Sequence, residues 1–388
     1  MSERCREFIC FIINKGRMGI VRMKRENAEK LEQYIAEFYQ DLSRVRTDKW
    51  NYEDGCLLIA AIQLYEATGN IRFRDFVVEY IGEYVTGEGE ILHYKKEDYK
   101  LDDVNPGRAV LFAYEQTGEE RFRKAMELLM SHLKEQPRTK AGNFWHKKIY
   151  PNQVWLDGLF MAQPFYMAHN TKFGGKDQYV DICGQFQVVR EKMLNQEKGL
   201  YYHGYDESRS IFWANQETGC SANFWLRAMG WYLVSLVDTM EEMDGRVYDH
   251  FRQLADIYKE ALAGILRYQD PVSGLFFQVV DHGELQGNYL ESSGSAMVAA
   301  SVLKACRLKV LLEEKYRPLG EGILDSLIER KLVDGHLMDS CSVAGLGPKE
   351  GRRDGSIEYY LSEPIKADDG KGVAATFMAY AQYLKLRQ

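Results

Sequence analysis

The chain has 388 residues, 45% of them hydrophobic, and a formal net charge of −7. This length and apolar content are enough to bury a sizeable core. The mild acidity argues against binding along a phosphate backbone, so we expect no nucleic-acid partner. An anionic sugar is not excluded, because the charge around a binding site is a local property.

The N-terminal residues 1–23 contain a short apolar run, residues 8–13 (FICFII), between basic residues. The run is short for a signal peptide, and no small-residue cleavage site follows it. We interpret residues 1–23 as a disordered or artefactual extension and residues 24–388 as one catalytic domain. No apolar run approaches the roughly 20 residues that a membrane helix needs, so we expect no membrane contact.

A repeat further along the chain indicates the fold. Residues 65–69 (YEATG) are echoed by residues 114–118 (YEQTG), and Arg-Phe-Arg follows both copies. Apolar helical stretches precede the copies, at residues 57–64 and 109–113, and Thr-Gly suits the end of a helix. An amphipathic helix is predicted after each turn. The unit is therefore a helical hairpin, and its repetition predicts an array of hairpins.

The rest of the chain agrees with an all-α fold of stacked hairpins in a single domain. Residues 236–262 carry a weaker echo of the repeat, and there are only 8 prolines. The main exception is residues 276–280 (FFQVV), which predict a short strand. An array closed into a ring would have no exposed ends, and its inner helix ends would surround a cavity.

Four regions interrupt the helical pattern with polar, aromatic and glycine residues, and each precedes a hydrophobic helix. These regions are residues 101–108, 144–161, 203–206 with 221–231, and 268–297. In a ring of hairpins such junctions cluster at one end. We therefore expect the functional site to lie at that end of the ring.

Each candidate in these regions has an ordinary structural interpretation when it is taken alone. Asp157 and Asp102 could be helix N-caps, since Asp is favoured there. His203 could be a structural histidine, and Arg227 a stacked surface arginine. Together the residues supply a cation, carboxylic acids and aromatic faces, which are the parts that a uronic acid site needs.

Four segments resemble glycoside hydrolase family 105, the unsaturated rhamnogalacturonyl hydrolases, and the likeness runs from about Trp50 to the C-terminus. The segments are residues 155–161 (WLDGLFM), 223–231 (NFWLRAMGW), 287–297 (GNYLESSGSAM) and 353–364 (RDGSIEYYLSEP). The resemblance implies an (α/α)6 barrel, six helical hairpins in a ring. It also implies that the partner is a small oligosaccharide that contains an unsaturated uronate.

The resemblance assigns the general acid/base to Asp157, which would add water across the C4=C5 double bond of a terminal uronic acid. Asp102 would orient the substrate or share proton transfer, since a second carboxylate nearby favours protonation of one of the pair. Lys147 and Arg227 are candidates for holding the uronate carboxylate, and Trp225 for stacking on the sugar. The remaining residues implied to bind the substrate are His146, Met161 and His203.

No cofactor is expected, and no sequence motif calls for a metal. The eight histidines include no close ligand pair, and the seven cysteines are scattered with no C-x-x-C pair. Such cysteines are typical of free thiols in a reducing compartment, so we expect a cytoplasmic protein.

Two alternatives remain open at this point. The unsaturated glucuronyl hydrolases, which act on glycosaminoglycan fragments, share the fold and chemistry of the family that this chain resembles. A catalytically silent carbohydrate-binding protein could also use the same ring. The presence of Asp157 together with Asp102, His203 and Arg227 argues against a silent protein. The sequence does not specify an oligomeric state.

Overall fold

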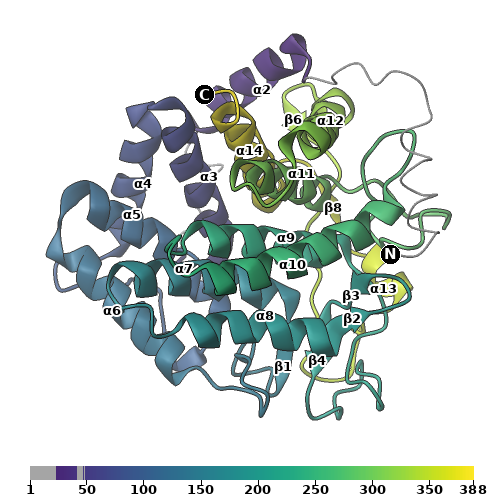
Figure 1. The fold of residues 1–388 in the computed structure, drawn as a ribbon, viewed down its shortest axis with the longest axis horizontal. Helices are drawn as coiled ribbons and strands as arrows, with labels where there is room; N and C mark the ends of the chain where they lie inside the picture. The colour runs from purple at the N-terminus through teal and green to yellow at the C-terminus, as the bar shows by residue number, and fades with distance from the viewer. Residues whose placement is uncertain (1–22, 42–46, 48) are drawn as a thin grey trace.

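Helices dominate the computed structural model, which describes residues 23–41, 47 and 49–388. Figure 1 shows one helical domain in which short strands occupy only the connecting loops. The predicted extension, residues 1–23, lies outside the described residues except for Met23, which is buried.

The repeat predicted two helical hairpins, and the structure confirms both. The first copy is α3 (Tyr52–Thr68) with α4 (Ile71–Tyr84), and the second is α5 (Gly107–Thr117) with α6 (Glu120–Glu135). α3 ends at a left-handed Gly69 with φ 68°, and α5 ends in the same way at Gly118 with φ 71°. Because residues with a Cβ disfavour this conformation, the Thr-Gly pair sets where each hairpin turns.

Further hairpins continue the pattern, and the helices sort into an inner and an outer ring. The inner helices are buried nearly all round, whereas the outer helices bury one face and expose the other. After the first two hairpins, the inner helices are α7 (Leu156–Lys172), α9 (Leu226–Glu241), α11 (Ser292–Arg307) and α14 (Gly370–Lys385). Their outer partners are α8 (Tyr179–Met193), α10 (Tyr248–Ile265), α12 (Glu313–Lys331) and α2 (Arg25–Phe38).

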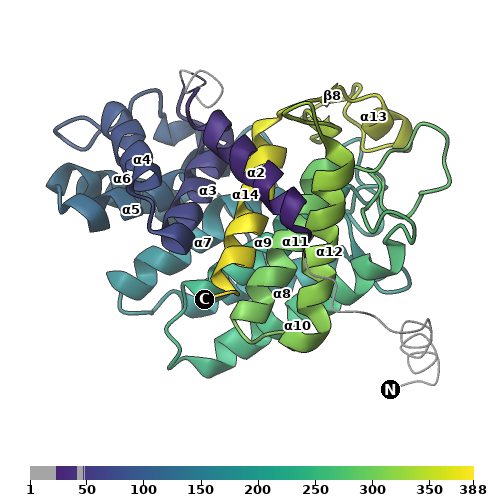
Figure 2. The same ribbon diagram turned by 90° about the horizontal axis from the view of Figure 1, so that it is seen from above.

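The two ends of the chain close the ring. Figure 2 shows α2 crossing α14, the last helix of the chain. The rings of Tyr34 and Phe38 meet the ring of Phe377 edge-on, at 5.6 and 5.5 Å between centroids. The side chain of Asn27 donates to Asp325 of α12 at 2.7 Å. The fold is thus the (α/α)6 barrel that the family resemblance implied.

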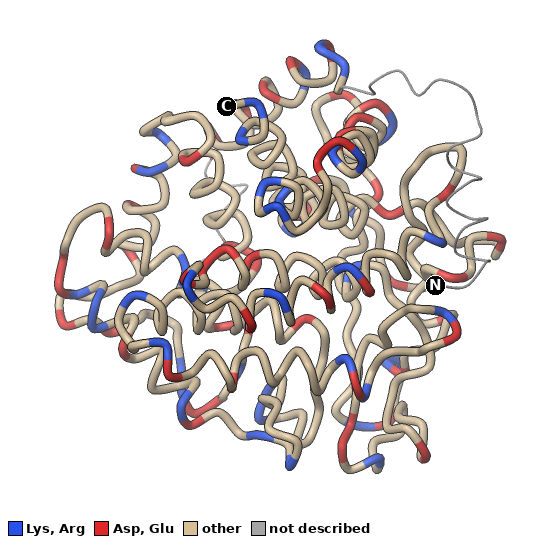
Figure 3. The backbone as a smooth tube through the Cα atoms, in the orientation of Figure 1, with Lys and Arg blue, Asp and Glu red and all other residues tan. Residues whose placement is uncertain are grey.

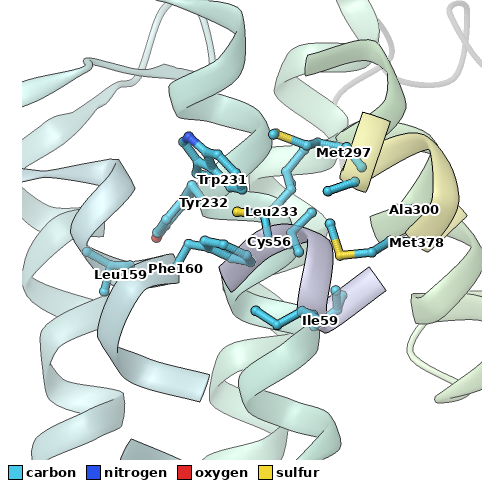
Figure 4. Close-up of a cluster of buried hydrophobic side chains, with 14 of the residues drawn as sticks. Cys56, Ile59, Leu159, Phe160, Trp231, Tyr232, Leu233, Met297, Ala300 and Met378 are labelled. Carbon is cyan, nitrogen blue, oxygen red and sulfur yellow. The ribbon is translucent and has the colours of Figure 1, made fainter. Parts of the chain in front are cut away.

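The apolar core fills the centre of this barrel. Figure 4 shows side chains of α3, α7, α9, α11 and α14 converging there. Phe160 stacks on Trp231 with centroids 4.4 Å apart, which joins α7 to α9. Both side chains are 1% exposed or less. Such close packing fixes the orientation of each inner helix about its own axis. It therefore determines which residues of the first turns face the mouth of the barrel, the end at which the inner helices begin.

Short strands and 3-10 turns fold the loops between hairpins. The predicted strand at residues 276–280 is wrong, because Phe277 and Val279 make only isolated bridges, to Leu290 and Trp225. The antiparallel pairs are β1 (Gln153–Trp155) with β4 (Gly204–Asp206), β2 (Leu194–Asn195) with β3 (Leu200–Tyr201), β5 (Leu332–Val333) with β6 (His336–Leu337), and β7 (Ser340–Cys341) with β8 (Ile365–Lys366). Single turns form η2 (Lys96–Asp98), η3 (Leu101–Val104), η4 (Leu266–Tyr268) and the short helix α13 (Ile357–Leu361).

Charged side chains of both signs are interspersed over the outer helices and loops (Figure 3). Among the described residues, no His, Cys, Asp and Glu side chains are grouped as a metal site requires, and no helix is long and apolar enough to cross a bilayer. The five described cysteines are free and buried. Cys5 and Cys10 lie outside the described residues.

Ring closure predicts the effect of one substitution in α2. Phe38→Ala should lower the free energy of unfolding by about 3–5 kcal/mol, because it opens a cavity between α2 and α14. Ile71→Ala is the control, since Ile71 is 55% exposed and should change stability by no more than about 0.5 kcal/mol. Urea unfolding followed by circular dichroism measures both. Equal effects would show that α2 does not close the barrel.

Candidate active site

The six inner helices begin at one end of the barrel, where neighbouring junctions are tied to one another around the ring. Four of the first helical N–H groups donate to a carbonyl of the following loop: Leu101 to His146 at 3.1 Å, Leu156 to His203 at 3.1 Å, Leu226 to Gln278 at 3.0 Å, and Ser292 to Asp339 at 3.0 Å. These four bonds satisfy helix-start donors that have no partner within their own helix. Side chains make the remaining ties, from Lys371 Nζ to Glu53 at 2.8 Å and from Trp50 Nε1 to Asp103 O at 2.8 Å.

A second regularity follows from the common start of the inner helices. The second residue is polar in each one, counting η3 as the first turn ahead of α5. We call these six side chains the rim residues. Around the ring they are Glu53, Asp102, Asp157, Arg227, Ser293 and Lys371. Three of them, Asp102, Asp157 and Arg227, are predicted site residues.

Asp157 is the predicted acid and lies in the first turn of α7. It is not the N-cap, which is Trp155, so the capping interpretation is wrong. Its carboxyl is 8% exposed, and Oδ2 is 3.4 Å from His203 Nε2. Both of these atoms are buried and accept or donate no hydrogen bond within the described structure. A group that can give or take a proton is thus left free for another molecule.

Asp102 forms an ion pair instead of capping a helix. Its Oδ2 is 2.5 Å from Lys147 Nζ, and its Oδ1 is 3.5 Å from His146 Nε2. Burial alone would raise the pKa of Asp102, but Lys147 and His146 lower it below its usual value. Lys147 also neutralises much of the Asp102 charge. The effect of Asp102 on Asp157 is therefore weaker than that of a lone carboxylate.

His146 belongs to an aromatic stack. The ring of Trp155 lies 4.4 Å from that of His146 and 4.8 Å from that of Tyr150, with interplanar angles of 18° and 24°. The His146 and Tyr150 centroids are 6.3 Å apart. Burial lowers the pKa of His146 to about 4, so the imidazole is neutral at neutral pH. This stack fixes His146 between Trp155 and the carboxylate of Asp102.

His203 connects the acid to the aromatic part of the site. It is 0% exposed, and its Nδ1 is hydrogen-bonded to the hydroxyl of Tyr360 at 2.8 Å. Its ring centroid is 4.8 Å from that of Trp225, which stacks in turn on Tyr360 at 6.2 Å. Trp225 is itself 1% exposed and donates from Nε1 to Gln278 Oε1 at 3.2 Å.

Arg227 is a buried cation rather than a surface arginine, so that interpretation is wrong. It is 1% exposed, and its guanidinium carbon lies 4.8 Å above the ring of Trp225. Nη1 donates to Cys341 O and to Ser293 Oγ, the latter at 3.3 Å, while Nε is buried without a partner. Within the described chain no carboxylate forms an ion pair with it. Its charge is thus available to an anionic ligand.

Met161 belongs to the apolar core and takes part in none of the contacts above. It lies four residues after Asp157 on α7 and is 2% exposed. The other seven predicted residues form two groups, one around Asp102 and one around His203, and the ring of Trp155 links them, 5.5 Å from the ring of His203.

Three rim residues and one tyrosine were not predicted. Glu53, Ser293 and Lys371 occupy the position that Asp157 has on its own helix, and comparison of the hairpin starts could have found them. Tyr360 is separated from its partner His203 by 157 residues, so no local pattern could indicate that contact.

Comparisons with known proteins identify the family of the chain. The model of Glycosyl Hydrolase Family 88 matches residues 22–387. A solved family 105 glycoside hydrolase from C. acetobutylicum ATCC 824 is 37% identical, with a TM-score of 0.86 over 92% of this chain and 98% of that one. The unsaturated rhamnogalacturonyl hydrolase YesR of Bacillus subtilis is 25% identical over 85% of this chain and 89% of its own length.

A more distant structure shares the fold alone. The unsaturated glucuronyl hydrolase from Bacillus sp. GL1 is 14% identical. That enzyme is responsible for the degradation of glycosaminoglycan. Its TM-score is 0.61 over 91% of this chain and 95% of that one. The barrel architecture therefore extends beyond the closer relatives.

The ion pair of Asp102 with Lys147 predicts how stability depends on pH. The pKa of Asp102 is lower in the folded protein than its unfolded value of about 3.9. The pair therefore stabilises fully above that value, and its contribution is lost as the pH falls through the folded pKa. Asp102→Asn should cost about 2 kcal/mol at pH 7, between the effects of exposed and buried ion pairs.

Urea unfolding from pH 7 to pH 3 measures this, and the difference between wild type and variant should shrink below about pH 4. Glu135→Gln is the control, because Glu135 pairs with Lys96 in an exposed position. It should have a much smaller effect. A difference for Asp102→Asn that stays constant across this range would contradict the ion-pair assignment.

Proposed function

The chain belongs to glycosyl hydrolase family 88 by its family model, and to family 105 by its likeness to the Clostridium enzyme, and we propose that it hydrolyses unsaturated rhamnogalacturonan oligosaccharides. The terminal 4,5-unsaturated galacturonyl residue would be released as an open-chain 4-deoxy-5-keto acid, because its double bond is hydrated in the reaction. One observation carries the proposal: buried Asp157 keeps an unpartnered oxygen beside His203, in a site with an uncompensated Arg227. The similarity to YesR, an unsaturated rhamnogalacturonyl hydrolase, supports the choice of substrate.

Asp157 is proposed to be the general acid and then the general base. The C4=C5 bond and the ring oxygen form a vinyl ether, so a proton from Asp157 to C4 leaves an oxocarbenium-like centre at C5. Water adds at C5 and returns a proton to the Asp157 carboxylate. The hemiketal opens to a ketone at C5, and the hemiacetal formed at C1 collapses and releases the partner sugar.

The two cations of the site would have different roles. Lys147 is already paired with Asp102, whereas Arg227 has no acidic partner. We therefore assign the uronate carboxylate to Arg227, through its free Nε–H. Asp102, kept ionised by Lys147, would accept hydrogen bonds from sugar hydroxyls. Trp225, His146, Met161 and His203 would shape the pocket around the ring.

The first experiment mixes the protein with the unsaturated galacturonyl-rhamnose disaccharide and follows the ultraviolet absorbance of the conjugated double bond. Wild type should remove the absorbance. Asp157→Asn should slow the loss by about 10²–10⁴, the usual contribution of a general acid or base. Asp181→Asn is the control, because Asp181 pairs with Arg138 away from the site, and its rate should match wild type.

The substrate panel separates the alternatives. Turnover of unsaturated chondroitin or hyaluronan disaccharides, with none of the rhamnose-linked substrate, would replace the proposal with a glucuronyl hydrolase. A protein that turns over neither kind of disaccharide would be a silent carbohydrate-binding protein. Equal rates for wild type and Asp157→Asn would remove Asp157 from its assigned role.

Substrate esterification tests the role of Arg227. Wild type should prefer the free acid over its methyl ester by roughly 10–100-fold in kcat/KM, the value of a charge-assisted hydrogen bond to a carboxylate. Arg227→Lys should lose most of this preference, because an ammonium cannot reproduce the Nε edge of a guanidinium. Unchanged discrimination in Arg227→Lys, measured with the same absorbance assay, would assign the carboxylate to another group.

A further inference from the structure

We infer that Tyr360 is a positioning residue that fixes the tautomer of His203 and so directs an N–H group at Asp157. The inference rests on the proposed function, because it concerns how the acid of that reaction is held. Tyr360 lies on α13, far from Asp157 and His203 in sequence, and is 0% exposed. Its hydroxyl has one partner, His203 Nδ1, at 2.8 Å.

The hydroxyl of Tyr360 is the donor in this bond. Burial raises the pKa of Tyr360 well above its usual value, so the phenol keeps its proton. A buried O–H that does not donate costs more than an acceptor lone pair that is not used. Because His203 Nδ1 is the available acceptor, Nδ1 carries no proton in the neutral ring, and the proton is on Nε2.

The other side of His203 fits the same tautomer. His203 Nε2 is 3.4 Å from Asp157 Oδ2, and neither atom has another partner in the described structure. When Asp157 is a carboxylate, as it would be after the first proton transfer of the proposed reaction, an Nε2–H group attracts it, whereas a bare Nε2 lone pair would repel it. One Tyr360 hydroxyl thus orders a chain of two contacts that ends at the acid.

Packing holds Tyr360 in place independently of this bond. Its ring stacks on Trp225 with an interplanar angle of 14°. The helix α13 is capped by the Ser356 side chain, which accepts from Tyr359 N–H at 3.1 Å. Removing the hydroxyl alone should therefore leave the ring where it is.

The chain offers a matched control in the neighbouring tyrosine. Tyr359 is also buried on α13, and its hydroxyl donates to Gly345 O at 2.7 Å and accepts from Gly345 N–H at 2.8 Å. Tyr360→Phe and Tyr359→Phe each remove a buried hydroxyl and its hydrogen bonding. Only Tyr360→Phe removes a contact with His203.

Kinetics on the unsaturated galacturonyl-rhamnose disaccharide form the first measurement. Tyr360→Phe should lower kcat by about tenfold with KM within about twofold, because the lost hydrogen bond acts on the acid and not on sugar binding. Tyr359→Phe should keep the wild-type kcat. Equal losses in the two variants would reduce Tyr360 to a structural tyrosine and overturn the inference.

Long-range ¹⁵N–¹H spectra of the histidine rings form the second measurement and need no substrate. The His203 signals are assigned from their absence in His203→Gln. Wild type and Tyr359→Phe should show a single tautomer with the proton on Nε2, and Tyr360→Phe a mixture. A proton on Nδ1 in wild type, or an unchanged tautomer in Tyr360→Phe, would overturn the inference.

The two measurements also separate the inference from the proposed function. If wild type turns over no unsaturated disaccharide, the proposed function fails, and the tautomer spectra still decide whether Tyr360 orders His203. If wild type is active and the tautomer is the same in all variants, the inference fails and the function stands.

Discussion

The site depends on the backbone hydrogen bonds that tie four of the inner helix starts to the next junction of the ring. Leu156 N–H, for example, donates to His203 O, so the helix that carries the acid is bound to the loop that carries its histidine partner. A helix start has donors without intrahelical acceptors, and a loop buried at the mouth has carbonyls to satisfy. The helix-start N–H groups donate to the loop carbonyls, and these hydrogen bonds hold residues from distant hairpins in fixed relative positions.

Buried charges that are paired and buried charges that lack an ion-pair partner lie in different parts of this barrel. Farther along the inner helices, Lys304 lies 2.6 Å from Asp238 and 2.5 Å from Glu241, and Arg108 lies 2.7 Å from Asp238. That buried network is compensated within the protein. At the mouth, Asp102 is compensated by Lys147, but Arg227 and Asp157 are not. A buried charged group without an ion-pair partner is costly, so Asp157 and Arg227 at neighbouring helix starts are where the proposed ligand would supply the missing interactions.

The sequence predicted what local rules determine. The Thr-Gly pairs ended α3 and α5 as expected, because a left-handed residue after a helix is a local requirement. The run at residues 276–280 did not form a strand. Backbone hydrogen bonds join it to residues 224–226 and 289–291, but each neighbour contributes only one isolated bridge. The clustering of Asp102, Asp157 and Arg227 followed from ring topology. The contact between Tyr360 and His203 did not, because it depends on how α13 folds back over the mouth.

The order of the rim residues explains how one ring can orient an acidic sugar. Going round from α3, the first three are carboxylic acids, Glu53, Asp102 and Asp157, and the next three are Arg227, Ser293 and Lys371. Glu53 pairs with Lys371 at 2.8 Å, where the two halves meet on one side. On the other side Asp157 and Arg227 start adjacent helices, α7 and α9. A 4,5-unsaturated uronate carries its carboxylate on C5, next to the C4 that must receive the proton. Asp157 and Arg227 thus stand at neighbouring positions where the acidic residues give way to the other three, and under the proposed function a carboxylate held by Arg227 would bring C4 to the side of Asp157.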